Sequence, residues 1–338
     1  MKCLGLTGDR QLKAYQVVGI GNAIVDVITQ SDDSFLELMG IQKGIMQLVE
    51  RDRGEVLYGA MQNRIQAPGG SVANTIAGLG KLGISTGFIG KVGADVLGRF
   101  YADAMSKDGT DFFNPPVEGD ALPTSRSMIF VTPDGERSMN TYLGISADLD
   151  AVDVPQSTVE QAGILFLEGY LFDKPGGKQA FRYAAQACQK AGGKAGISLS
   201  DPFCVDRHRK DFRALVSQLD YAIGNHEEWQ SLYQTQNLES ALKQAAQNCD
   251  LIVCTRGSAG ATIASQDGKI DIPINPIKAL DSTGAGDQFA TGFLYGLATG
   301  RDLETCGRMG CIAASEVIVH IGSRPEADIA ALFTSAGL

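Results

Sequence analysis

Residues 281–297 read DSTGAGDQFATGFLYGL, a glycine-rich turn that leads directly into an apolar stretch. In that stretch apolar side chains recur every fourth residue, which is the spacing of one face of an α-helix. The pattern predicts a buried helix over 285–298 whose first turn carries Asp287. The free amides and the positive dipole end of such a helix favour an anion beside it. The amides expected to face that anion belong to Gly284, Ala285 and Gly286.

Outward from this turn, β-branched apolar runs alternate with helical patterns along the chain. The expected strands lie at residues 17–20, 88–92, 164–167, 195–199, 221–223 and 251–254. The expected helices lie at residues 71–81, 98–107, 178–190, 211–218, 238–247 and 285–298. Repeated strand–helix–strand units predict an α/β fold, with a mostly parallel central sheet and helices on both faces. Ligands of such sheets bind beyond the carboxyl ends of the strands.

One segment departs from this alternation. Residues 127–132 and 137–142 flank the turn sequence PDGE, which predicts a β-hairpin. With the polar, poorly periodic stretch 31–66, the hairpin indicates a small accessory sheet beside the main one. An ordinary edge hairpin and a lid over a site both explain it. We expect one domain over the whole chain, in which a lid takes residues from two segments, about 27–66 and 110–145.

The composition narrows the class of protein. Lysine and arginine number 29 against 39 aspartates and glutamates, a net charge of −10, and no basic run is present to neutralise a nucleic acid. No apolar run approaches the roughly 20 residues that span a bilayer, and we expect no export signal. The seven cysteines form no Cys-x-x-Cys pair and most lie in apolar context. We therefore expect core thiols and a reducing, cytoplasmic setting, with a small molecule as the main partner.

The carboxylate of Asp287 lies beside the expected amide cradle, and this pairing suits one type of chemistry. It can accept a proton from a substrate hydroxyl while the amides stabilise charge on a transferred phosphoryl group. A structural alternative is that Ser282 or Thr283 caps the helix and Asp287 complements its dipole. Two glycines and two acids within seven residues favour the functional interpretation.

Two further clusters lie where strands or helices are expected to end or begin. Gly69 and Gly70 open an expected helix, and Asn74 lies one turn into it. Asn22 and Asp26 follow the first expected strand, where they can bind vicinal hydroxyls or make an Asx turn. Both clusters are candidates for substrate contacts.

Five short motifs follow one another along the chain. They are Gly69-Gly70-x-x-x-Asn74, GADVLG at 93–98, Asn225-x-x-Glu228, TRGSAG at 255–260 and DSTGAGD at 281–287. Their kind and order resemble those of the ribokinase-like (PfkB) family of carbohydrate and nucleoside kinases. The resemblance covers residues 17–325. It implies a ribokinase-like three-layer α/β/α domain with a small β-sheet lid.

The resemblance also implies an activity, the transfer of the γ-phosphate of ATP to a sugar hydroxyl with Mg²⁺. Asp287 would be the catalytic base, and the turn at 284–286 would be the anion hole. Arg137, in the expected hairpin, would steady the transferring phosphate with its guanidinium fork. The alternative for Arg137 is a solvated hairpin arginine.

On the nucleotide and metal side, the resemblance implies that Asn225 and Glu228 organise Mg²⁺ and phosphates through water. Asp281 would help to hold a monovalent cation such as K⁺, or would simply brace its loop. The remaining residues implied on this side are Thr255, Gly257, Gly260 and Thr283.

Within the family, the opening GNAIVDV at 21–27 is similar to that of adenosine kinases. There the Asn and Asp grip ribose hydroxyls, and the matching residues here are Asn22 and Asp26. The resemblance implies phosphorylation of the adenosine 5′-hydroxyl, giving AMP and ADP, with ribose or fructose as alternative acceptors. An apolar slot for the purine would come from Ile24, Met128 and Tyr170.

Two other classes of protein share parts of this pattern. A Rossmann-type oxidoreductase needs its Gly-x-Gly-x-x-Gly between strand and helix, but the match at 78–83 ends an expected helix. A non-catalytic nucleoside- or sugar-binding protein on the same scaffold would not need Asp287. The sequence fits either a monomer or a homodimer.

Overall fold

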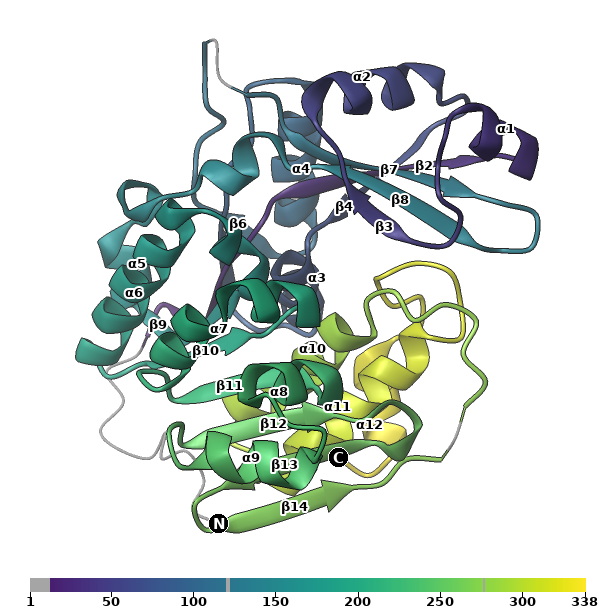
Figure 1. The fold of residues 1–338 in the computed structure, drawn as a ribbon. Helices are drawn as coiled ribbons and strands as arrows, with labels where there is room; N and C mark the ends of the chain where they lie inside the picture. Colours follow the sequence, from purple (N-terminus) through teal and green to yellow (C-terminus); the bar gives the residue numbers. More distant parts are fainter. Residues whose placement is uncertain (1–12, 120–121, 276) are drawn as a thin grey trace.

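The computed structural model describes residues 13–119, 122–275 and 277–338, and its largest element is a nine-stranded sheet (Figure 1). The strand order is β14-β13-β12-β11-β10-β9-β1-β5-β6. The parallel strands are β1 (Tyr15–Ile20), β5 (Thr86–Ile89), β6 (Thr110–Phe112), β9 (Ala162–Glu168), β10 (Lys194–Ser198), β11 (Tyr221–Asn225) and β12 (Leu251–Thr255). The antiparallel edge is formed by β13 (Ala261–Ser265) and β14 (Gly268–Ile272). The predicted mostly parallel sheet is confirmed.

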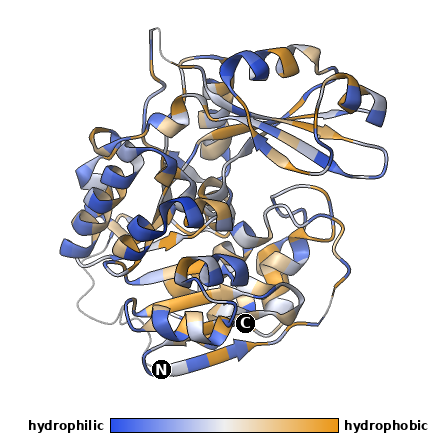
Figure 2. Ribbon diagram, viewed as in Figure 1, coloured by the Kyte–Doolittle hydropathy of each residue, from blue (hydrophilic) through white to orange (hydrophobic). Residues whose placement is uncertain are grey.

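Helices cover both faces of this sheet, as expected. One layer contains α3 (Ser71–Lys81), α4 (Val96–Lys107), α10 (Ala285–Ala298) and α11 (Leu303–Val317). The other contains α5 (Gln156–Glu160), α6 (Pro175–Lys190), α7 (Pro202–Val216), α8 (His226–Tyr233) and α9 (Leu238–Ala246). Adjacent strand residues enter opposite layers, since Val17 packs into the first core and Val18 into the second. Figure 2 shows apolar strands between helices with hydrophilic outer faces.

The lid is a separate five-stranded sheet, ordered β3-β8-β7-β2-β4 (Figure 1). Its strands are β2 (Ile24–Gln30), β3 (Met46–Leu48), β4 (Ile65–Gly69), β7 (Ser125–Val131) and β8 (Arg137–Tyr142). Two helices, α1 (Asp33–Leu38) and α2 (Arg51–Ala60), cover its outer face. The predicted hairpin is confirmed as β7–β8.

The second lid segment begins later than the expected residue 110. Residues 110–112 form β6, which pairs with β5 at the edge of the large sheet, so the lid resumes only with β7. A three-residue strand is too short to show a period in the sequence. The C-terminal α11 and α12 (Ile329–Ser335), which pack against each other, were also not predicted.

The structure also bears on the expectations for the cysteines and for membrane-spanning segments. The six described cysteines are buried, as predicted for core thiols: Cys188, Cys204, Cys249, Cys254, Cys306 and Cys311. None of the helices in the described ranges is both long and apolar enough to cross a bilayer.

Candidate active site

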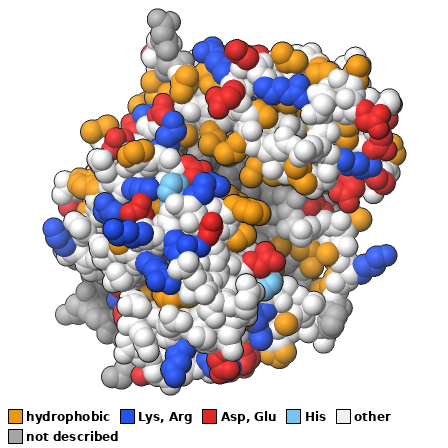
Figure 3. Space-filling model, viewed as in Figure 1, with side chains coloured by type: hydrophobic (Ala, Val, Ile, Leu, Met, Phe, Trp, Pro, Cys, Tyr) orange, Lys and Arg blue, Asp and Glu red, His pale blue; other side chains and the backbone are white. Residues whose placement is uncertain are grey.

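The carboxyl ends of the parallel strands meet the lid along a hollow in the molecular surface (Figure 3). β1 ends two residues before Asn22, and β9 ends at Glu168. β11 ends at Asn225, and β12 ends at Thr255. The topology therefore brings segments distant in sequence to one edge, where a ligand of such a sheet is expected.

Asp287 lies in the first turn of α10, as predicted. Gly284 precedes the helix with a φ of 80°, and a Cβ there would lie 2.6 Å from the Cα of Ser323. Asp287 Oδ1 accepts a hydrogen bond from Ser71 Oγ at 2.7 Å, and its Oδ2 accepts one from Asn74 Nδ2 at 3.0 Å. Burial raises the pKa of Asp287 to about 6, although both hydrogen bonds and a nearby arginine oppose the rise. The group therefore suits a general base at neutral pH.

The turn before α10 differs from the prediction at one amide. The Ala285 amide donates to the Ser282 carbonyl at 3.2 Å, because the turn closes with its own backbone bond. Within the described residues the amides of Gly284 and Gly286 have no protein acceptor. No atom lies within 4 Å of where a Gly286 Cβ would be, so the helix start is open. The candidate anion site thus keeps two of its three expected amides.

A buried ion pair joins the lid to this turn. Arg137, at the start of β8, places Nη1 2.8 Å from Asp281 Oδ2, and 8% and 11% of these side chains are exposed. Asp281 also accepts from the amides of Thr283 at 2.9 Å and Gly322 at 3.1 Å. Burial alone would raise the pKa of Asp281, but these hydrogen bonds outweigh burial and lower it. Arg137 is therefore not a solvated hairpin residue.

The same contacts bear on the expected monovalent cation. Each carboxylate oxygen of Asp281 already has a partner, and one partner is the guanidinium of Arg137. A cation placed there would be repelled by that guanidinium. The residues present do not fit K⁺ at Asp281. Over the described ranges, no group of three or more His, Cys, Asp and Glu residues is arranged to hold a metal ion.

The start of α3 holds Asp287 in place. Gly70 has a φ of 100°, and a Cβ there would strike the Asn22 carbonyl. Asn74 is 4% exposed, and its Oδ1 accepts from Arg324 Nε at 3.2 Å. The Asn74 side-chain amide thus donates its hydrogen bond to Asp287 in this structure. Arg324 was not predicted, because a lone arginine in an irregular loop shows no period or motif.

Asp26 lies on β2, close enough to Asp287 for their charges to interact. Its carboxyl group lies over Gly69, where a Cβ would sit 2.8 Å from all three carboxyl atoms. Burial raises the pKa of Asp26 to about 6. The charges of Arg137 and Arg324 oppose this rise, and that of Asp287 adds to it. No described residue donates a hydrogen bond to the Asp26 side chain, so its oxygens are free for ligand hydroxyls.

In this structure both polar atoms of the Asn22 side chain have protein partners, and its predicted role as a ribose ligand stays a prediction. Asn22 is 2% exposed, its Nδ2 donates to Glu168 Oε1 at 2.7 Å, and its Oδ1 accepts from Ser146 Oγ at 2.9 Å. Glu168 also accepts from the Val72 amide at 3.0 Å, and burial raises its pKa to about 7. Sequence patterns did not reveal this buried acid, since its partners come from three separate segments.

Met128 points away from the hollow, so its predicted place in a purine slot is wrong. Asp26 pairs in register with Ser127, and strand residues alternate between faces. Ser127 and Ile129 therefore share the face of Asp26, whereas Met128 is buried in the core under the lid helices. Ile24, two residues before Asp26, lies on the same face of β2 as Asp26, and its predicted contact with a purine stays a prediction.

Tyr170 lies in the short 3₁₀ turn Gly169–Asp173 that follows β9. Burial raises its pKa well above the usual value, and the charges of Asp201, Glu228 and Asp287 add to the rise. The predicted place of Tyr170 in a purine slot stays a prediction.

Asn225 and Glu228 form the N-terminal capping box of α8. Asn225 Oδ1 accepts from the Glu228 amide at 2.9 Å, while the Glu228 carboxylate accepts from the Asn225 amide at 2.8 Å and from Nδ2 at 2.9 Å. Glu228 is 5% exposed, and burial raises its pKa to about 7. A directly bound metal would break this box. A Mg²⁺ ion that keeps its waters fits the pair.

The predicted nucleotide-side loop follows Thr255 at the end of β12. Gly257 and Gly260 have φ values of 55° and 83°, and a Cβ on Gly260 would strike the Ile272 carbonyl. Beside this loop lies a cavity of about 700 Å³ between α11 and the segment that follows β14. Side chains of α11 that line it include Arg308, Cys311 and Ser315.

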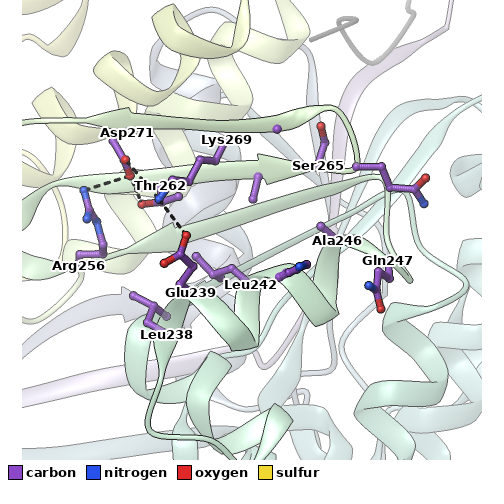
Figure 4. A pocket seen from close by; sticks show the side chains of 14 residues that line it. Leu238, Glu239, Leu242, Ala246, Gln247, Arg256, Thr262, Ser265, Lys269 and Asp271 are labelled. Atoms are coloured by element: carbon purple, nitrogen blue, oxygen red, sulfur yellow. Dashed lines mark hydrogen bonds and ion pairs between the residues drawn. The ribbon is translucent and has the colours of Figure 1, made fainter.

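A second cavity, of about 780 Å³, lies between α9 and the β13–β14 hairpin (Figure 4). Its charged side chains pair with one another, as Arg256 does with Asp271 at 3.5 Å and Lys269 with Glu239 at 3.8 Å. None of the predicted site residues lines it. It is separate from the cluster of acids at the hollow.

Comparison with known proteins agrees with this geometry. Residues 35–329 match the family described as pfkB family carbohydrate kinase. The chain belongs to the pfkB family. The predicted ribokinase-like fold is thereby confirmed, and a Rossmann-type oxidoreductase is excluded.

Solved pfkB structures and curated sequences give more detailed likenesses. The adenosine kinase from Sinorhizobium meliloti superimposes with a TM-score of 0.87 at 41% identity, covering 96% of this chain and 99% of that one. A probable sugar kinase protein from Rhizobium etli CFN 42 gives the same values. The 5-dehydro-2-deoxygluconokinase of Bacillus subtilis strain 168 is 27% identical over 317 residues, or 90% of each chain. Kinases of the pfkB family use ATP, typically with Mg²⁺, and act on sugars or nucleosides.

Proposed function

We propose that this pfkB kinase transfers the γ-phosphate of ATP to the 5′-hydroxyl of adenosine, giving AMP and ADP. One observation carries the proposal. The Asp287 carboxylate, held by Ser71 and Asn74, lies at a helix start where the amides of Gly284 and Gly286 are free. The 41% identity to the adenosine kinase from Sinorhizobium meliloti supports adenosine as the acceptor.

In the proposed reaction Asp287 accepts the proton of the acceptor hydroxyl as its oxygen attacks phosphorus. A positioned base contributes about 10²–10⁴-fold. The free amides of Gly284 and Gly286 face negative charge on the transferring group. Arg137 reaches the same group by exchanging its bond to Asp281 for one to a phosphate oxygen. Mg²⁺ bound with ATP would neutralise phosphate charge.

The charges around the acceptor position favour a neutral molecule. Asp26 and Asp287 lie close enough for their charges to interact, and each raises the cost of placing another anion beside them. Of the two nearest cations, Arg324 is held by Asn74 and Asp108, and the proposed reaction uses Arg137 for the transferring phosphate. A sugar acid of the gluconate type carries a carboxylate that this pocket would repel. A nucleoside or neutral sugar meets no such barrier.

Apolar surface favours a nucleoside over a free sugar. Ile24 lies on the Asp26 face of the lid, and Tyr170 lies in the turn after β9 on the large domain, so both could contribute apolar surface to one slot. A purine buries such surface, whereas a hydrated sugar does not. The cavity beside Gly260 would accept the adenine of ATP, which leaves the hollow under the lid for the acceptor.

The test is ADP formation with ATP and Mg²⁺ against adenosine, inosine, ribose, fructose and 5-dehydro-2-deoxygluconate. We expect the highest kcat/KM for adenosine, with Asp287→Asn as the background control. A higher value for ribose or fructose would replace adenosine by a sugar. A higher value for the sugar acid would contradict the charge argument, and no ADP with any acceptor would support a non-catalytic binding protein.

A further inference from the structure

We propose that Arg324 is a positioning residue for Asp287: it fixes the orientation of the Asn74 amide and places a positive charge behind the base. The inference rests on the proposed function, in which Asp287 accepts the proton of the acceptor hydroxyl. Arg324 lies in the loop between α11 and α12, outside the motifs that carry the family resemblance.

The first part of the argument is the direction of the hydrogen bonds. Arg324 Nε donates to Asn74 Oδ1 at 3.2 Å, and Asn74 Nδ2 donates to Asp287 Oδ2 at 3.0 Å. An arginine has only donors and a carboxylate only acceptors, so the amide between them has one favourable orientation. A flipped amide would direct its oxygen at the carboxylate and its NH₂ at the guanidinium. Arg324 therefore holds the amide that stabilises ionised Asp287.

The second part is the rigidity of Arg324 itself. Its Nη1 pairs with Asp108, which follows α4, and 17% and 15% of the two side chains are exposed. The preceding loop is also anchored, because the Gly322 amide donates to Asp281 and the Ser323 carbonyl accepts from Gln288. The guanidinium is thus held at both ends and kept from bulk water, where its charge would be screened.

The third part is the balance of charge around Asp287. The groups that face it are Arg324 from the C-terminal loop, Asp26 from β2, Glu168 from β9 and Tyr170 from the turn after β9. Arg324 is the cation among these four. Its removal leaves burial and acidic neighbours opposed only by hydrogen bonds, so the pKa of Asp287 should rise.

Arg324→Met keeps the length of the side chain and removes its charge and donors. We expect the acid limb of the kcat/KM profile to move to higher pH by roughly 0.5–1 unit. Activity would then fall more near pH 6 than near pH 8. A residue that only supported the fold would lower the rate equally at all pH values. An unshifted limb in Arg324→Met would overturn the inference.

A matched control comes from the other cation at Asp108. Lys81 lies 3.5 Å from Asp108 and is half exposed, but it forms no hydrogen bond to Asn74. Lys81→Met should leave the acid limb in place. Arg324→Lys retains charge without the rigid fork, and we expect it to recover part of the shift. An equal shift in Lys81→Met would contradict a specific role for Arg324.

A second readout separates this inference from the proposed function. The carboxyl carbons of ¹³C-labelled aspartate can be titrated by NMR without substrate, with Asp287→Asn assigning the resonance. The Asp287 resonance should titrate at higher pH in Arg324→Met than in the wild type. If it does while the wild type phosphorylates no acceptor, the proposed function fails and the positioning role stands. If the titration is unchanged, the positioning role fails whatever the activity.

Discussion

In the proposed function, Asp26 is the residue that would select the acceptor. Its carboxylate is unpartnered within the described residues and lies over Gly69, where any larger residue would displace it. Because its carboxylate is on the lid and lacks a hydrogen-bond donor among the described residues, we propose that it takes two neighbouring hydroxyls of the acceptor. It should therefore act in binding more than in the chemical step.

We expect Asp26→Asn to raise the acceptor KM by roughly 10–100-fold, because a hydrogen bond to a charged group is lost. The KM for ATP should stay within about threefold of the wild type, since the nucleotide side is untouched. Steady-state kinetics with each substrate varied in turn would measure both. Asp103→Asn, on the exposed side of α4, is the control. An unchanged acceptor KM would remove Asp26 from the acceptor site.

At the scale of elements, two helices of this chain begin with an asparagine cap. The Asn225 side chain accepts from the Glu228 amide at the start of α8, and Asn237 accepts from the Ser240 amide at the start of α9. Both bonds are 2.9 Å long. Only the first cap lies at the carboxyl edge of the sheet. Comparing variants of the two asparagines therefore distinguishes the effect of losing a helix cap from an effect on catalysis.

Asn225→Ala and Asn237→Ala should each lower the free energy of unfolding by about 1 kcal/mol, measured by urea denaturation. Asn225→Ala should lose somewhat more, because Glu228 remains buried without its Nδ2 partner. Only Asn225→Ala should raise the KM for ATP or lower kcat. Equal activity of the two variants would mean that Asn225 and Glu228 only cap α8 and have no role in catalysis.

The elements also show what sequence patterns can and cannot predict. Long periodic segments such as α10 and the buried parallel strands were predicted because each carries its own period. The side of the sheet on which a strand residue lies depends on the pairing register of its strand, and this register is not visible in the sequence. Met128 was therefore assigned to the wrong side of β7. Partners across the fold also lie outside any local pattern. This explains why the sequence did not predict the hydrogen-bond partners of Glu168 or the position of Arg324.

At the scale of the whole molecule, the lid and the large domain meet through the Arg137–Asp281 pair. Both side chains are buried, and they lie 144 residues apart in sequence. Loss of one partner leaves the other charge buried without compensation, which is costly. The pair therefore links the lid to the turn that precedes Asp287.

Arg137→Met should increase hydrogen exchange along β7 and β8, because the ion pair between the lid and the large domain is lost. It should also lower kcat by at least about 10²-fold, because the variant lacks the positive charge that would stabilise the transferring phosphate. Lys43→Met is the control. Lys43 pairs with Asp33 and Asp134 within the lid, so its loss should leave exchange in those strands and the rate unchanged. Unaltered exchange in Arg137→Met would mean that the ion pair does not hold the lid.

The most direct test of the account is the turnover of Asp287→Asn with adenosine and ATP. The substitution keeps the size of the side chain and removes its ability to accept a proton. We predict that kcat falls by at least about 10²-fold while the Kd for adenosine, measured by calorimetry, stays within about threefold. Turnover equal to that of the wild type would show that Asp287 is not the base and would contradict the account.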